Sequence, residues 1–182
     1  MSVSAQTAYE ASKLARERYA EYYANHHGMA MAGLRFFSVY QGFGGNEKHK
    51  GEYANTVAQF ADAIANGEAP KLFGDGTQTR DFTHVDDVAW ACELAADHKL
   101  TGVYNVGTEK AYTFNEMVEL INDALGTEID PEYIECPFDN YVHDTMADVT
   151  KFREATGWEP KIEFADGIKQ VCEPYLNESV EI

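Results

Sequence analysis

The alternation of apolar, strand-like segments with amphipathic segments of helical period is the feature that most constrains how this 182-residue sequence folds. Residues 30–40 read AMAGLRFFSVY, an apolar and aromatic run typical of a buried strand. Residues 53–66 follow, with apolar side chains at helical spacing and an Asn-Gly stop at their end. This alternation predicts an α/β protein with parallel strands.

The same reasoning predicts the other elements. Helices are expected over residues 9–25, 86–97, 113–126, 148–156 and 164–175, and short strands over 71–74, 79–85, 103–106 and 129–134. Thr113 and Glu116 form a capping-box pattern at the start of one helix. Asp86 or Asp87 is expected to cap the 86–97 helix, and Asp148 to cap the next short one.

The acidic composition limits the partners that this chain can bind. Fourteen Lys and Arg against 31 Asp and Glu give a net charge of −17. Nucleic acids and anionic membranes are bound through clustered cations, so neither partner is expected. The acids are spread along the chain, which favours a solvated, halophile-like acidic surface over an acidic interaction tail.

The sequence also predicts a cytoplasmic, metal-free protein. It contains no apolar run near the roughly 18 residues of a membrane span and no signal-peptide pattern. Cys92, Cys136 and Cys172 are scattered and odd in number, as is typical of reduced thiols. No Cys or His spacing predicts a metal site.

Tyr9 and Lys13 are the first candidates for chemistry. Their i, i+4 spacing places both side chains on one face of the predicted helix. An ammonium near a phenol favours the phenolate, so such a tyrosine can act as a general base near neutral pH. An ordinary exposed helix pair is the alternative interpretation of the spacing alone.

Four further motifs follow this pair, and together they carry a family resemblance. They are RFFSVY at 35–40, FGDGTQTRDFTHVDDV at 73–88, YNVGT at 104–108 and GWEPK at 157–161. In this order and at these spacings, they resemble the second half of the nucleotide-sugar epimerase/dehydratase family, the extended short-chain dehydrogenases. The resemblance extends from Tyr9 to about Tyr175, and the run from Gly74 to Val88 is its most specific part.

The resemblance implies a fold in two parts. Residues 1–45 correspond to the C-terminal part of a Rossmann-type parallel sheet with the tyrosine helix. Residues 46–182 correspond mainly to the smaller α/β domain that holds the nucleotide sugar, although residues of about 79–106 return to the Rossmann sheet. The family's Gly-rich cofactor turn lies upstream of the tyrosine. Residues 42–45 spell GFGG before a polar loop, so we interpret residues 41–51 as a loop and the chain as the C-terminal half of such an enzyme.

The resemblance also implies catalytic and cofactor-binding roles. The tyrosine matching Tyr9 removes a sugar hydroxyl proton while hydride passes to NAD, with NADP not excluded. The lysine matching Lys13 binds the nicotinamide ribose, and Phe36 contacts the cofactor. A keto-sugar forms, and it takes the hydride back on its other face or loses water. In the subgroup that epimerises ADP-heptose at carbon 6, a lysine in a His-Lys-Gly loop is a second base; Lys50 matches it, with a solvated loop lysine as the alternative.

For the substrate, the resemblance implies a second set of residues. Arg80 pairs with the diphosphate, for which a bidentate guanidinium is well suited. Leu72 and Phe73 lie along the nucleobase. Ser38 stands where the family has an Asn that binds the diphosphate, and Asn140 lies where a second cation is usual.

The expected function is NAD-dependent epimerisation of a nucleotide-diphosphate sugar, with a UDP-hexose 4-epimerase as the default. The alternatives are an ADP-heptose 6-epimerase, an NDP-glucose 4,6-dehydratase, and an inert sugar-nucleotide-binding half-enzyme. The expected partner is a second copy of the chain or a completing N-terminal half. Leu14, Tyr19, Tyr22 and Tyr23 could form a dimer face or pack on the chain's own sheet.

Overall fold

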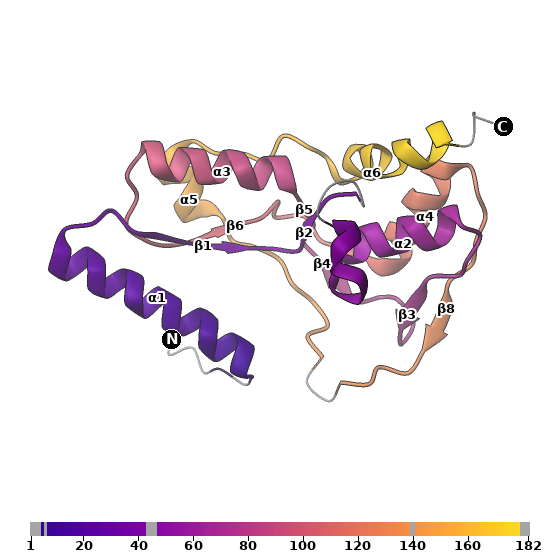
Figure 1. The fold of residues 1–182 in the computed structure, drawn as a ribbon, viewed down its shortest axis with the longest axis horizontal. Coiled ribbons are helices and arrows are strands. Elements are labelled where there is room, and N and C mark those ends of the chain that lie inside the picture. Colours follow the sequence, from indigo (N-terminus) through magenta and orange to yellow (C-terminus); the bar gives the residue numbers. More distant parts are fainter. Residues whose placement is uncertain (1–4, 6, 43–46, 139–140, 179–182) are drawn as a thin grey trace.

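The computed structural model describes residues 5, 7–42, 47–138 and 141–178 (Figure 1). In chain order the elements are α1 (Ala8–His27), β1 (Ala32–Phe36), β2 (Val39–Tyr40), the 3-10 helix η1 (Glu47–Tyr53), α2 (Thr56–Ala65), β3 (Lys71–Phe73), β4 (Thr79–Arg80), β5 (Thr83–His84), α3 (Val85–Asp97), β6 (Gly102–Val106), β7 (Tyr112–Thr113), α4 (Phe114–Leu125), β8 (Glu132–Ile134), α5 (Thr150–Thr156) and α6 (Phe164–Glu178). The α/β class is therefore confirmed.

The described strands form pairs rather than one continuous sheet. The pairs β1–β6, β2–β5 and β3–β8 are parallel, as predicted, whereas β4–β7 is antiparallel. The single strand expected over residues 30–40 is divided, because Ser38 has a φ of 26° and separates β1 from β2. The loop expected over 41–51 contains the start of η1, and residues 43–46 lie outside the described part. The domain division at residue 45 stays a prediction.

Two apolar clusters make up the core. The larger one joins α2, α4 and α6, which gather at one end of the molecule in Figure 1. The smaller one packs α3 and α5 against β6 around the fully buried rings of Phe152 and Trp158. Within the described part of the chain, no helix has the length and hydropathy needed to cross a bilayer.

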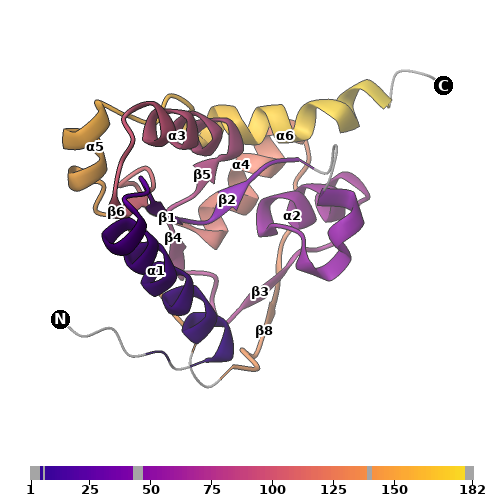
Figure 2. The ribbon, with the colours of Figure 1, turned by 60° about the vertical axis from the view of Figure 1, so that its left-hand side comes forward.

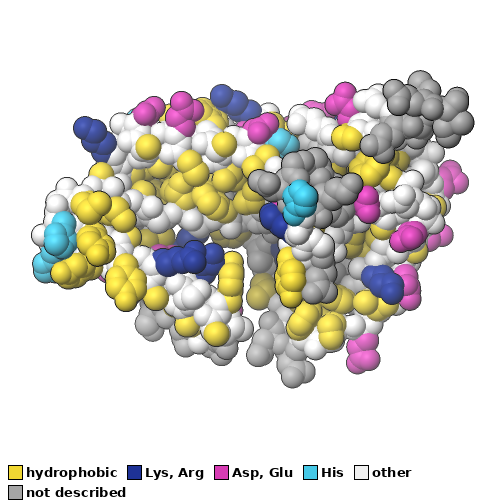
Figure 3. Space-filling model, in the orientation of Figure 1, with side chains coloured by type: hydrophobic (Ala, Val, Ile, Leu, Met, Phe, Trp, Pro, Cys, Tyr) yellow, Lys and Arg dark blue, Asp and Glu magenta, His cyan; other side chains and the backbone are white. Residues whose placement is uncertain are grey.

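Helix α1 lies on one side of the β1–β6 pair, while α3 and α5 lie on the other (Figures 1 and 2). None of its residues is buried. Tyr19, Tyr22 and Tyr23 are exposed, so the alternative that these tyrosines pack on the chain's own sheet is wrong. In Figure 3, hydrophobic and histidine side chains gather where α1 ends, and there the rings of Tyr22 and His26 lie 4.8 Å apart.

Three expectations about helix starts have different outcomes. The capping box of Thr113 and Glu116 is confirmed. The expected Asp cap of α3 is wrong: His84 Nδ1 accepts the hydrogen bond from Asp86 N, whereas Asp87 is buried. Helix α5 begins one residue later than an Asp148 cap requires, although Asp148 Oδ1 still accepts from the amide of Thr150 at 3.0 Å.

Candidate functional site

Helix α1 brings Tyr9 and Lys13 together. Thr7 starts the helix by accepting a hydrogen bond from Glu10 N, and Gly28, with a φ of 63°, ends it. Lys13 Nζ lies 4.9 Å from the centroid of the Tyr9 ring, so the predicted shared face is confirmed. The Tyr9 side chain is 69% exposed and accessible to a ligand.

Tyr9 and Lys13 border a hollow of about 650 Å³ between α1 and β1. Phe36, at the end of β1, lines the same hollow, as do the cations Arg16 and Arg35. The structure therefore gathers in one place the three residues expected to face a cofactor.

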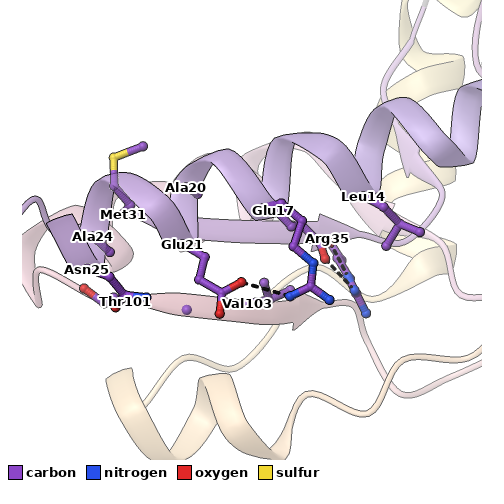
Figure 4. Close-up of a pocket in the computed structure, with 12 residues that line it drawn as sticks. Leu14, Glu17, Ala20, Glu21, Ala24, Asn25, Met31, Arg35, Thr101 and Val103 are labelled. Carbon is purple, nitrogen blue, oxygen red and sulfur yellow. Dashed lines mark hydrogen bonds and ion pairs between the residues drawn. The ribbon is translucent and has the colours of Figure 1, made fainter. Parts of the chain in front are cut away.

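A second hollow, of about 480 Å³, lies between α1 and β6 (Figure 4). Arg35 and Glu17 line both hollows, because their ion pair crosses from β1 to α1. Arg35 Nε and Nη2 donate to the two Glu17 carboxylate oxygens at 2.6 and 2.8 Å. This hydrogen bonding, opposed by burial, lowers the pKa of Glu17 below its usual range. A bidentate ion pair thus attaches the helix that carries Tyr9 to the sheet.

A third hollow, of about 180 Å³, brings Ser38 and Arg80 together; we call it the anion pocket, after the diphosphate that the family resemblance predicts for these two residues. Asn55, which precedes α2, also lines it and was not predicted from the sequence. Its side-chain oxygen accepts from Ala58 N at 2.9 Å and caps α2. An Asn directly before an apolar helical segment is a capping signal, and that signal would have pointed to Asn55.

Arg80 is held by carbonyl oxygens and aromatic rings. Its guanidinium donates to the carbonyls of Thr79 at 2.7 Å, Val142 at 2.6 Å and His143 at 2.8 Å. It also lies 5.7 Å from the Phe114 ring centroid and 5.2 Å from that of Tyr141. Because these acceptors are neutral, the positive charge of Arg80 remains able to attract an anion.

The other residues predicted to bind the substrate differ in how far they are buried. Leu72 is fully buried in the larger core, so only its main chain could contact a ligand. Phe73 is partly buried, and its ring packs edge-on against Phe138 at 6.0 Å and Tyr141 at 5.7 Å. Asn140 lies outside the described residues.

Lys50 lies in η1. Its ammonium is paired with the carboxylate of Glu47. The described residues lining the Tyr9 hollow come from α1, β1 and β2 and do not include Lys50. No group of three or more metal-ligating side chains occurs among the residues that the structure describes.

Comparison with known proteins identifies the family. The profile of the NAD dependent epimerase/dehydratase family matches residues 1–107. The chain belongs to this family. The resemblance inferred from the motifs is therefore confirmed, including its likeness to two kinds of epimerase.

Relatives in this family are named as sugar-nucleotide epimerases. The chain is 36% identical over 163 residues to a putative UDP-glucose 4-epimerase of Methanocaldococcus jannaschii, covering 90% of this chain and 51% of the relative. It is 35% identical to an ADP-L-glycero-D-manno-heptose-6-epimerase of Alkalilimnicola ehrlichii, covering 81% and 48%. The chain thus spans about half the length of these curated relatives.

Solved structures in the family share the fold. UDP-glucose 4-epimerase with UDP-glucose from Thermotoga maritima matches with a TM-score of 0.83 and 32% identity, over 95% of this chain and 54% of that one. The NAD complex of the UDP-glucose 4-epimerase from Thermus thermophilus matches with a TM-score of 0.79 and 31% identity, over 92% and 53%.

Proposed function

We propose that this chain is the substrate-binding and tyrosine-bearing part of an NAD-dependent nucleotide-sugar epimerase, with a UDP-hexose as the default substrate. The observation that carries the proposal is that one chain provides both a Tyr–Lys pair open to a hollow and an arginine in an anion pocket. The names of the relatives support the UDP-sugar class. A cytoplasmic location and adaptation to high salt stay predictions.

In this function Tyr9 is the acid/base. Its exposed hydroxyl can reach a sugar bound in the hollow, and the Lys13 ammonium lies 4.9 Å from the centroid of the same ring. Tyr9 takes the proton from the oxygen of the sugar hydroxyl, and the carbon that bears this oxygen would give its hydride to the nicotinamide of a bound cofactor, which leaves a keto-sugar. After the keto-sugar rotates, the hydride would return to the opposite face of the carbonyl carbon, and Tyr9 would return the proton to the oxygen.

The residues around the first hollow fit the nicotinamide end of NAD. Lys13 offers ammonium donors to ribose hydroxyls, and Phe36 offers an apolar ring beside them. When bound, the cofactor supplies the hydride acceptor and donor.

The anion pocket is the proposed diphosphate site. Arg80 offers a planar, charged donor, Ser38 a hydroxyl, and the start of α2 the positive end of a helix. The neighbouring rings of Phe73 and Tyr141 offer apolar surface for a nucleobase.

An ADP-heptose 6-epimerase is the second candidate. The relative from Alkalilimnicola ehrlichii favours it, as does the His49-Lys50-Gly51 sequence. In that reaction Lys50 would be the second base, and its ammonium would have to leave Glu47 and lose a proton before it could accept one. A 4,6-dehydratase and an inert half-enzyme stay open as well.

We propose that the chain works with a partner, because one face of α1 is left uncovered in the described structure. The partner is either a completing N-terminal half or a second copy. The face of α1 that carries Tyr19, Tyr22 and Tyr23 is uncovered and available for this contact.

The deciding experiment titrates the purified chain with UDP in molar salt and assays the denatured protein for released NAD(H). Saturable UDP binding supports the proposed substrate class, and its absence would overturn it. Near-stoichiometric NAD(H) and turnover of UDP-glucose that Tyr9→Phe abolishes would support the epimerase. UDP binding without NAD(H) would support the inert half-enzyme instead.

A further inference from the structure

Glu47 is a buried carboxylate beside the anion pocket that the proposed mechanism does not use. Its side chain is 3% exposed, at the first residue of η1. One carboxylate oxygen accepts a hydrogen bond from the main-chain N–H of Asn55 at 2.9 Å. The other accepts from Gln41 Nε2 at 3.3 Å and from the Lys50 ammonium. A carboxylate with this many donors is ionised and fixed in place.

The electrostatics agree with this geometry. Burial raises the pKa of the Glu47 carboxyl, but the hydrogen bonds from Lys50, Asn55 and Gln41 outweigh burial and hold the pKa below its usual range. Glu47 therefore carries its negative charge at neutral pH. A buried charge of this kind costs free energy unless its partners stay in place, so the contacts are mutually dependent.

Asn55 connects Glu47 to the pocket. Asn55 lines the pocket with Ser38 and Arg80, and its side chain caps α2. Its Nδ2 donates to the carbonyl of Gln41 at 2.9 Å, directly after β2. Glu47 thus contacts both segments that flank the pocket, the end of β2 and the start of α2, although it does not line the pocket itself.

We propose that Glu47 is a positioning residue of the anion pocket: it fixes Asn55 and the start of α2 relative to Arg80, and it tethers Lys50 at the edge of the same segment. This inference rests on the proposed function and deepens it. The affinity for a nucleoside diphosphate therefore depends on a residue that does not touch the ligand.

The test compares UDP affinity in the wild type, Glu47→Gln and Lys50→Met by calorimetry well below the unfolding temperature. In Glu47→Gln, an NH₂ group replaces one acceptor oxygen, so Asn55 or Lys50 loses its partner. We expect UDP binding about tenfold weaker. Lys50→Met leaves the Glu47–Asn55 bond in place and is expected to weaken binding less. The matched control is Asp166→Asn, which removes an exposed i, i+3 pair with Lys169 and is expected to leave UDP affinity unchanged.

The outcomes separate the positioning role from the proposed function. A purely structural role would lower the unfolding temperature of Glu47→Gln without changing UDP affinity, and that result would overturn the positioning role while the proposed function stands. A wild type that does not bind UDP would overturn the proposed function and the positioning role together. If Glu47→Gln does not fold, Glu47→Asp withdraws the charge by one methylene, and wild-type UDP affinity in that variant would equally refute the proposal.

Discussion

Helices α6 and α1 are both long, yet they attach to the molecule in opposite ways. Helix α6 buries four apolar side chains, from Phe164, Ile168, Val171 and Cys172, in the larger core. Helix α1 has 20 residues and buries none. The ion pair of Glu17 with Arg35, both partly exposed to water, links it to the sheet, and Leu14, Ala20 and Ala24 on the same helix are only half-buried.

This difference separates the two halves of the candidate site. The anion pocket is built on the apolar core, because Phe82 and Phe114 line the pocket and belong to that core. The Tyr9–Lys13 pair stands on the helix that has polar contacts and hollows beneath it. Burial of apolar surface stabilises a region far more than an exposed ion pair does, so we expect α1 to open locally long before the α2–α4–α6 region unfolds.

The largest expected effect on stability comes from truncating a buried side chain of α6. Ile168→Ala removes a fully buried side chain and is expected to lower the free energy of unfolding by about 2–5 kcal/mol. Tyr19→Ala on α1 removes a larger but exposed side chain and should change it by less than about 0.5 kcal/mol. Denaturant unfolding of both variants measures the contrast, and equal losses would contradict the division between the two helices.

A smaller effect is expected from adding one methyl group to α6. A Cβ on Gly167 would overlap the Tyr40 hydroxyl oxygen, so Gly167→Ala is expected to lower the free energy of unfolding by about 1–3 kcal/mol despite the better helix propensity of Ala. Among the described residues, that buried hydroxyl has no hydrogen-bond partner. Tyr40→Phe should therefore be tolerated and should rescue Gly167→Ala in part in the double variant, as followed by thermal unfolding, because the ring carbon Cζ would still lie 2.8 Å from the new Cβ. No rescue at all would mean that the hydroxyl contributes little to the clash and that the ring carbons account for it.

The sequence predicted what depends on local spacing. The capping box of Thr113 and Glu116 and the shared face of Tyr9 and Lys13 follow from helical geometry within a few residues. The family motifs located Arg80 and Ser38, which the structure brings into one pocket. Periodicity was therefore enough to predict the class of fold. The order of the motifs was enough to predict two residues of the anion pocket, Ser38 and Arg80.

Long-range contacts could not be predicted in this way. Asp87 was expected to cap a helix, but its carboxylate accepts from the amides of Lys161 and Ile162, more than 70 residues away. The exposure of α1 depends on how it is placed against β1 and β6, and helical spacing within α1 does not contain that information. Glu47 had no sequence signal, because its role depends on the folded positions of Gln41 and Asn55.

The next prediction sharpens the comparison in the anion pocket. Arg80→Lys keeps the charge but loses the planar fork that reaches the carbonyls of Val142 and His143. We expect UDP binding about tenfold weaker, because one ammonium cannot replace a bidentate donor. Arg18→Lys on exposed α1 is the control and should bind UDP like the wild type. Equal affinities in all three proteins would show that Arg80 does not hold the diphosphate.

The smallest expected effect concerns the attachment of α1. Arg35 holds the folded-state pKa of Glu17 below its usual value, so the ion pair stabilises the α1 contact above the unfolded pKa of about 4.3 and loses this stabilisation as the pH falls through the folded pKa. Amide exchange across α1, corrected for intrinsic rates, should show less protection at pH 3 than at pH 7. At both pH values, Glu17→Gln should show the low protection that the wild type shows at pH 3. At pH 7 the variant should therefore be less protected than the wild type, by less than about 1 kcal/mol. Glu21→Gln breaks an ion pair with Arg18 inside α1 and is the matched control. If Glu17→Gln and Glu21→Gln behave alike, the ion pair to β1 does not hold the helix, and the apolar edges of the two hollows must do so.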